Sequence, residues 1–199
     1  MVPPVRSYEE SPFGFTWVLD EPLARASHAI AVDGRVWIID PTDVPEAIDR
    51  ARSLGQPAAV VQLLDRHNRD CAAIAAGLEI PHLKVPDEVP DSPFETIAAV
   101  RVPGWRETAL WWPAQAALVV AEVVGTNSLY TGGGEGVGMH IMLRALPPGR
   151  LRGMRPEHLL VGHGAPVHGD EASAGLERAY ERARRDLPRA LLNAPRAMR

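Results

Sequence analysis

The sequence is poor in cysteines, in long apolar runs and in net charge, and each of these absences excludes a class of protein. It contains one cysteine among 199 residues, which excludes an internal disulfide and is typical of proteins in the reducing cytoplasm. No apolar run is long enough to cross a membrane, and the first residues, MVPPVRSYEESPF, lack the apolar core of a signal peptide. The formal net charge of −4 gives no electrostatic reason to bind nucleic acid or an anionic membrane. We therefore expect a cytoplasmic protein with neither of these partners.

The composition favours one globular domain made of many short elements. Hydrophobic residues make up 46% of the chain, which is enough to bury a sizeable core. The 19 prolines and 17 glycines indicate frequent turns. We predict a single domain over residues 1–199, with its core at about 13–187 and a frayed C-terminal tail after Pro188.

The first half of the chain is predicted to mix hairpins with helical crossovers. Residues 27–40 should form a hairpin, because the Asp-Gly pair at its centre suits a two-residue turn with positive φ. A helix is expected over residues 44–55, closed by a glycine. The continuous apolar run AAVVQLL, residues 58–64, is typical of a strand covered on both faces. An Ala-rich helix should begin near Asp70.

The second half repeats this pattern. Strands are predicted over residues 97–102, 108–112, 117–123 and 159–161, with PGWRE (103–107) as a turn. MHIMLRAL (139–146) should form a short helix, and a charged amphipathic helix should begin at Asp170. Strands of this kind with helical crossovers predict an α/β fold in which helices cover two β-sheets.

Polar residues gather where the strand at 58–64 meets the next helix, in the stretch LLDRHNRDCAAIAA (63–76). PGW (103–105), the segment WWPAQAALVVAEVV (111–124) and GHG (162–164) follow in that order. Together these motifs resemble the metallo-β-lactamase fold superfamily. Its signature is a buried strand, His-Xaa-His-Xaa-Asp-His, an Ala- or Gly-rich helix, a Pro-Gly-His turn, a Gly-Asp and a Gly-His-Gly turn. The resemblance implies a four-layer αββα sandwich with its active site, usually holding two metal ions, at one edge.

Most ligand positions of the family pattern have changed residue type in this chain. The four ligand positions of the first motif hold Arg66, Asn68, Asp70 and Cys71. Only Asp70 matches the family. Trp105 replaces the histidine of the Pro-Gly-His turn, and Glu122 stands where the resemblance places a bridging aspartate. His163 matches the last ligand turn directly.

The first hypothesis is a protein that keeps the fold but has lost the dinuclear site. Arginine and tryptophan cannot bind a metal, and asparagine is a poor zinc ligand. Arg66 would place a fixed positive charge where the family has a cation, paired with Asp70 or Glu122. The chain would then be an atypical or inactive hydrolase relative that binds a small molecule, with Asp70 and His163 as its catalytic candidates. The predicted pocket consists of Arg66, His67, Asn68, Trp105 and Glu122.

The alternative hypothesis is a mononuclear metal-dependent hydrolase. Its ligands would be Asp70, Cys71 and His163, with Glu122 as a candidate fourth, and this set suits a single zinc ion. Cys71 would have to bind as a thiolate, which the N-terminus of a helix favours.

Three other histidines could reach the same region. His67 lies one residue away from each ligand position, so its side chain is expected to point elsewhere, although rotation into the site as a ligand or base remains an alternative. His140 and His168 are predicted on loops that could face the same pocket, although exposed histidines are the commoner case.

A purely structural interpretation accounts for the same residues without a metal. Asp70 would cap the helix and pair with a neighbouring arginine. Cys71 would be a small buried hydrophobe, and His163 would hydrogen-bond within its glycine turn. The fold would then serve as an interaction module. Under any of these interpretations, exposed strand edges would allow a homodimer. The glycine-rich segment 125–138 is expected to form a mobile flap over the pocket, with a plain flexible connector as the structural alternative.

Overall fold

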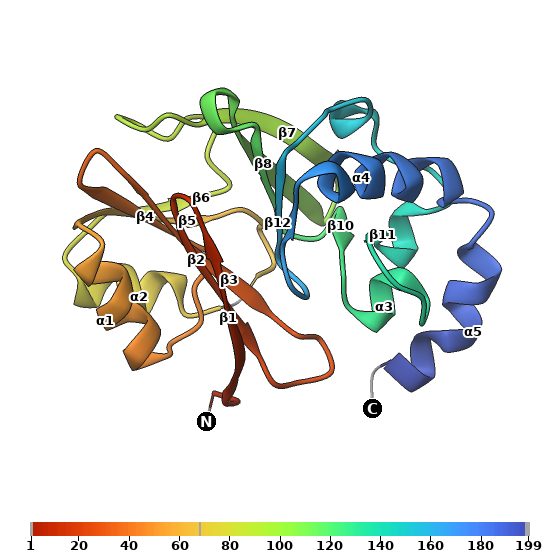
Figure 1. Cartoon of the computed structure of the whole chain (residues 1–199), viewed down its shortest axis with the longest axis horizontal. Helices are drawn as coiled ribbons and strands as arrows, with labels where there is room; N and C mark the ends of the chain where they lie inside the picture. The colour runs from red at the N-terminus through yellow and green to blue at the C-terminus, as the bar shows by residue number, and fades with distance from the viewer. Residues whose placement is uncertain (1, 68, 198–199) are drawn as a thin grey trace.

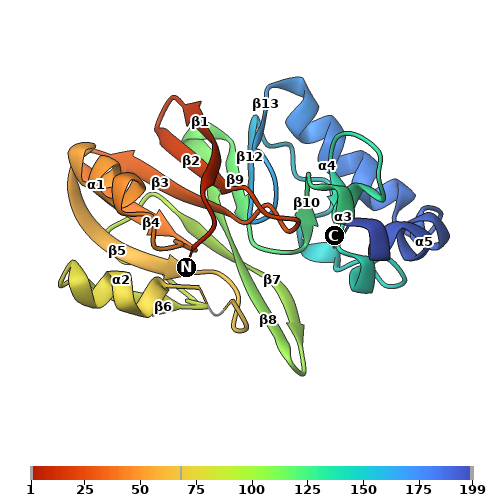
Figure 2. The ribbon, with the colours of Figure 1, turned by 90° about the horizontal axis from the view of Figure 1, so that it is seen from below.

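The computed structural model describes residues 2–67 and 69–197 and has four layers. One sheet has the strand order β1-β2-β3-β4-β5-β6, and the other has the order β13-β12-β9-β8-β7. The helices α1 and α2 lie on the outer side of the first sheet, and α4 lies on the outer side of the second (Figures 1 and 2). This arrangement confirms the predicted αββα sandwich.

The first half of the chain builds one sheet and its helical layer. The strands are β1 (Val5–Ser11), β2 (Gly14–Leu19), β3 (Ala26–Val32), β4 (Arg35–Ile39), β5 (Gln56–Gln62) and β6 (His82–Lys84), and the helices are α1 (Pro45–Ser53) and α2 (Cys71–Gly77). The strands from β1 to β4 are antiparallel, whereas β4, β5 and β6 run parallel. The segment after β5 therefore leaves the carboxyl edge of the sheet, where ligand sites form in α/β proteins.

The second half builds the other sheet. Its strands are β7 (Glu95–Val102), β8 (Trp105–Trp112), β9 (Ala117–Val120), β12 (His158–Val161) and β13 (Val167–His168). A two-stranded ribbon is formed by β10 (Val124–Gly125) and β11 (Gly138–Met139). The helical segments are η1 (Pro113–Gln115), α3 (Ser128–Thr131), η2 (Ile141–Leu143), η3 (Gly149–Leu151), α4 (Asp170–Arg182) and α5 (Leu187–Ala197). None of the helices in the described part of the chain is long and apolar enough to span a membrane.

The apolar layers of the sandwich follow from the alternation of side chains along the strands. The layer between the sheets contains Trp37, Leu64, Leu110 and Val119. The layer between the first sheet and its helices contains Trp17, Ile38, Ala47 and Ile74, among others. Both faces of β5 are therefore covered, as its continuous apolar run predicts.

Local turn chemistry was predicted correctly at the β3–β4 hairpin. Asp33 and Gly34 have φ values of 49° and 75°, as a turn of this class requires. The strand or helix type was also correct for α1, β5, α2, β12 and α4.

Four local predictions differ from the structure. The predicted turn PGWRE is shorter, because β8 begins at Trp105. The predicted helix 139–146 is only the 3₁₀ turn η2, and Met139 instead pairs in the β10–β11 ribbon. The segment 125–138 contains α3 and is closed by that ribbon, so it is not a featureless flap. Residues after Pro188 belong to α5, which packs near α3, so the predicted frayed tail is helical up to Ala197.

Candidate functional site

Asp40 and the loop after β5 form one side of the candidate site. Asp40 follows β4 with a φ of 44°, and its Oδ1 accepts the N–H of Leu63 at 3.0 Å. Its Oδ2 lies 3.1 Å from Nδ1 of His67. The loop is anchored further because Leu63 and Leu64 are buried between the sheets. His67 is therefore held in place by a buried carboxylate from the neighbouring strand.

Glu122, in the turn after β9, lies at the centre of the site. Its Oε1 is 3.4 Å from Nε2 of His67 and 3.8 Å from Nε2 of His163. Its Oε2 is 2.9 Å from Nη2 of Arg66 and 4.0 Å from Nε2 of His140. Burial opposes ionisation of this carboxyl, but contacts from His163, His67 and Arg66 outweigh burial and hold the pKa of Glu122 far below its usual range. The site therefore contains one carboxylate surrounded by cationic and imidazole groups.

His163 is fixed by the turn that follows β12. Its Nδ1 donates to the carbonyl oxygen of Leu23 at 2.9 Å, which leaves the lone pair of Nε2 facing Glu122. The ring of Tyr130 stacks on the imidazole with a centroid distance of 5.5 Å. Gly164 next to it has a φ of 97°, and a Cβ there would lie 2.2 Å from Oγ1 of Thr126. The glycine is therefore required for the turn that presents His163.

Three side chains form a group that could hold a metal ion. One ligand atom from each of His67, Glu122 and His163 lies within 4.8 Å of the others, and no second group of this kind occurs in the described part of the chain. The Nε2 atoms of both histidines are buried and have no hydrogen-bond partner among residues 2–67 and 69–197. Their Nδ1 atoms are occupied by Asp40 and by the carbonyl of Leu23, which is how proteins commonly orient metal-binding histidines. Two imidazole nitrogens and one carboxylate oxygen suit zinc and related ions.

Arg66 lies on the solvent side of this group. Its guanidinium donates to Glu122 and stacks over Trp105, with Cζ 3.8 Å from the ring centroid. Trp105 is buried in β8, and its Nε1 donates to Oε2 of Glu107 at 3.3 Å. Of the two partners expected for Arg66, the structure selects Glu122 over Asp70.

Asp70 and Cys71 are not brought to this group. Oδ2 of Asp70 accepts the N–H of Asp43 at 2.8 Å and makes no bond to its own helix, so the expected side-chain cap is not formed either. Cys71 is 1% exposed and packs in the layer between the first sheet and its helices. Burial raises the pKa of its thiol to about 12. The predicted ligand set of Asp70, Cys71 and His163 is therefore not assembled, because α2 directs Cys71 into a different layer.

We expect the Cys71 thiol to resist an aromatic disulfide reagent in the folded protein at pH 8. A buried thiol with a pKa of about 12 has almost no thiolate at that pH, so labelling should be at least about 100-fold slower than in urea-unfolded protein. The measurement is the release of the chromophore over time in both states. Equally fast labelling in the two states would show that the thiol is accessible and ionised.

The structure differs from the expectations at several residues of the site. His67 was expected to point away, with rotation into the site as the alternative; the turn after Leu64 directs it to Glu122, which supports the alternative. Asp40 was not considered, and Glu107 was placed in the predicted turn 103–107, so no feature of the sequence indicated its burial. His140 does face the site, and burial lowers its pKa to about 4. His168 instead lies 2.8 Å from His158, Nδ1 to Nδ1, away from the site, and Asn68 lies outside the described residues.

Comparisons with known proteins bear on the fold. A scan against family models found no match, and a search of curated proteins found no matching relative. Among solved structures, DIM-1 metallo-β-lactamase exposed to ceftazidime has a TM-score of 0.61 at 15% identity, covering 92% of this chain and 99% of that chain. A metallo-β-lactamase from Erythrobacter litoralis gives 0.58 at 9% identity, with 93% and 94% covered. TMB-1 gives 0.53 at 13% identity, with 92% and 99% covered. The chain therefore has the metallo-β-lactamase fold.

Proposed function

We propose that this chain is a metallo-β-lactamase-like protein that has lost most ligands of a dinuclear site and binds one divalent transition metal at His67, Glu122 and His163. Zinc is the expected ion. The proposal rests on two buried Nε2 atoms that face the same carboxylate and lack hydrogen-bond partners in the described part of the chain. Leaving such atoms unsatisfied in a protein interior costs free energy, and a bound cation would satisfy both.

The proposed reaction class is metal-assisted hydrolysis of a small substrate that carries a carboxylate or phosphate. A metal held by three protein ligands can lower the pKa of bound water and polarise a substrate oxygen. Asp40 would orient His67 and increase its basicity through the contact at Nδ1. Arg66, with 37% of its side chain exposed, would hold the anionic group of the substrate or stabilise developing negative charge. The ring of Trp105 packs against the guanidinium of Arg66.

A metal-free binding protein is the second candidate function. It is favoured by the ion pair between Arg66 and Glu122 at 2.9 Å, in which a guanidinium supplies the positive charge. Burial and Arg69 lower the pKa of His67, but Asp40 and Glu122 outweigh them and raise it above its usual value. A protonated His67 would then complete the charge balance. In this case the protein would bind an anionic small molecule without hydrolysing it.

Metal content distinguishes the two functions. Protein purified without chelator should contain close to one equivalent of zinc by mass spectrometry of the metals, and Co²⁺ substitution should give a d–d absorption spectrum. His67→Ala and His163→Ala should each weaken metal affinity by about 100-fold or more, and Asp40→Asn by roughly 10- to 100-fold. Hydrolysis of a panel of small esters and phosphate esters should depend on the metal.

The matched controls are Asp70→Asn and Cys71→Ser, which replace residues of the alternative ligand set. They should retain the metal, because neither side chain reaches the group. Circular dichroism confirms that each variant is folded before its metal content is compared. Loss of metal in Cys71→Ser with retention in His67→Ala would refute the assigned ligands. Folded wild-type protein that takes up no metal would refute the metal site and support the metal-free binding function.

A further inference from the structure

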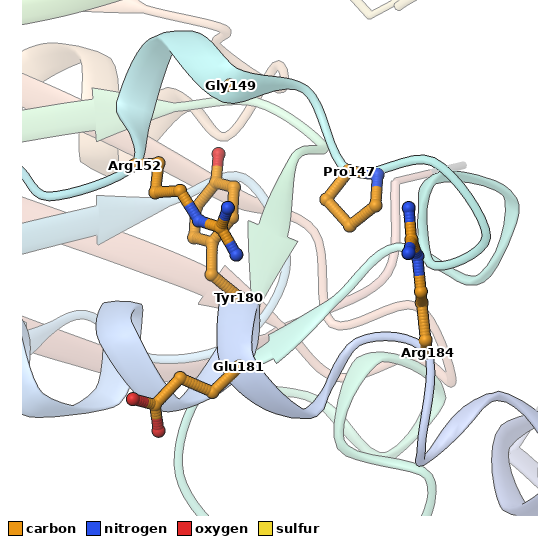
Figure 3. Close-up of a pocket in the computed structure, with 6 residues that line it drawn as sticks. All are labelled: Pro147, Gly149, Arg152, Tyr180, Glu181 and Arg184. Atoms are coloured by element: carbon orange, nitrogen blue, oxygen red, sulfur yellow. The ribbon is translucent and has the colours of Figure 1, made fainter.

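A cavity lies away from the His67–Glu122–His163 group, at the end of α4. It has a volume of about 300 Å³ and is lined by Pro147, Gly149, Arg152, Tyr180, Glu181 and Arg184 (Figure 3). The first three residues come from the connector around η3, and the others come from α4 and the turn after it. None of them belongs to the His67–Glu122–His163 group. The cavity therefore needs an explanation of its own.

Two guanidinium groups line this cavity. Arg184 donates from Nε to the carbonyl oxygen of Ala145 at 3.1 Å, and its remaining N–H groups are not engaged by that bond. Neither Arg152 nor Arg184 forms an ion pair with a carboxylate in residues 2–67 and 69–197. Glu181 also lines the cavity, yet Figure 3 shows its carboxylate directed away from the other labelled side chains. The cavity is thus lined by two exposed guanidinium groups that form no ion pair with a described carboxylate.

Tyr180 provides a second, independent indication of a ligand. The residue is 5% exposed, and no described residue forms a hydrogen bond with its buried hydroxyl. Figure 3 shows this hydroxyl pointing toward the segment that carries Gly149. Burial raises the pKa of Tyr180 above its usual value, so the hydroxyl remains a neutral donor at physiological pH. Unsatisfied buried hydroxyls are uncommon in folded proteins and call for a missing partner.

We propose that this cavity binds a small molecule through its phosphate or carboxylate group, held by Arg152 and Arg184 with the Tyr180 hydroxyl as a third donor. Arginine pairs with such anions through two parallel hydrogen bonds, which explains a site built from guanidinium groups. A volume of about 300 Å³ is at the lower end for ligand pockets, so it fits a compact metabolite and excludes a polymer. The site is independent of the proposed metal centre.

Calorimetric titration with inorganic phosphate tests this site, with succinate as the carboxylate probe and sodium chloride at equal ionic strength as the blank. Wild-type protein should bind one equivalent saturably. Arg152→Gln and Arg184→Gln should each weaken binding by about tenfold or more, and Tyr180→Phe by roughly threefold to tenfold. Tighter binding of phosphate than of succinate would identify a phosphorylated ligand, and the reverse order a carboxylic acid.

The matched control is Arg155→Gln. Arg155 is also exposed and close in sequence, but it is paired with Glu177 at 2.9 Å, so phosphate affinity should not change. The double variant Arg152→Gln/Arg184→Gln should lose binding while keeping its metal content and its unfolding midpoint. Unchanged affinity in the double variant, or no saturable binding by the wild-type protein, would overturn the proposal. Because the metal is monitored separately, failure here is distinct from failure of the metal centre.

Discussion

Replacement of Arg69 by methionine is expected to reduce the free energy of unfolding by about 3 kcal/mol or more. The guanidinium donates to the carbonyl oxygens of Ala26 and Asp40, the latter at 2.9 Å, and from its other nitrogen to Gly162 at 2.9 Å. Ala26 and Asp40 belong to the first sheet, whereas Gly162 follows β12 of the second. One side chain therefore joins the two sheets directly beneath the candidate site.

Urea unfolding followed by tryptophan fluorescence measures this change. Arg52→Met is the control, because Arg52 is 59% exposed and its pair with Asp49 contributes little. The free energy of unfolding of Arg69→Lys should lie between those of the wild-type and methionine proteins. An ammonium lacks the planar fork with which the guanidinium reaches three carbonyl oxygens. A methionine variant as stable as the wild type would show that the three carbonyls need no common donor.

Glu107→Ala is expected to destabilise the protein by roughly 3–5 kcal/mol and to weaken metal binding at the same time. Glu107 is fully buried in β8, and its Oε1 accepts the N–H groups of Ala121, Glu122 and Val123 at 2.9, 3.0 and 3.3 Å. Alanine leaves these three donors and the Trp105 indole N–H without their acceptor. The turn that presents Glu122 should then lose its position.

Unfolding free energy and zinc affinity of this variant are measured together, with Glu88→Ala as the control. Glu88 lies in an exposed loop, so its replacement should change stability by less than about 0.5 kcal/mol. A Glu107→Ala protein that unfolds at the wild-type midpoint would contradict this role.

The pH dependence of Glu107→Gln provides a further readout of the same residue. Burial raises the pKa of Glu107 to about 7 from 4.5, although the backbone N–H groups favour its ionised form. Between these values the folded state binds more protons than the unfolded state, so this group's contribution to stability falls as pH rises from about 4.5 to 7. Glutamine cannot titrate, so the cost of the substitution should be larger at pH 5 than at pH 8, by roughly 3 kcal/mol. An equal cost at both values would mean that Glu107 is ionised throughout.

The placement of the candidate site at the sheet edge was predictable, and so were Glu122 and His163 among its candidate ligands, whereas His67 in place of Asp70 and Cys71 was not. The stretch 63–76 was assigned to a strand-to-helix junction, and the structure places it there between β5 and α2. The residue spacing of the resemblance pointed to Asp70 and Cys71, yet His67 faces Glu122. A shift of one residue around a tight turn reverses which side chains face the site, and that shift depends on how Leu63 and Leu64 pack between the sheets.

The sequence by itself determined the order and type of the main elements, which follow from apolar periodicity and the backbone needs of glycine-containing turns. The resemblance of its motifs to the metallo-β-lactamase fold superfamily implied the αββα sandwich and the edge at which the site lies. Only the tertiary structure decided that Asp40 holds His67, that Arg69 joins the two sheets and that Glu107 supports the turn at Glu122. These contacts join residues that are distant in the chain. They arise from the way the two sheets pack, and no local pattern in the sequence reports that packing.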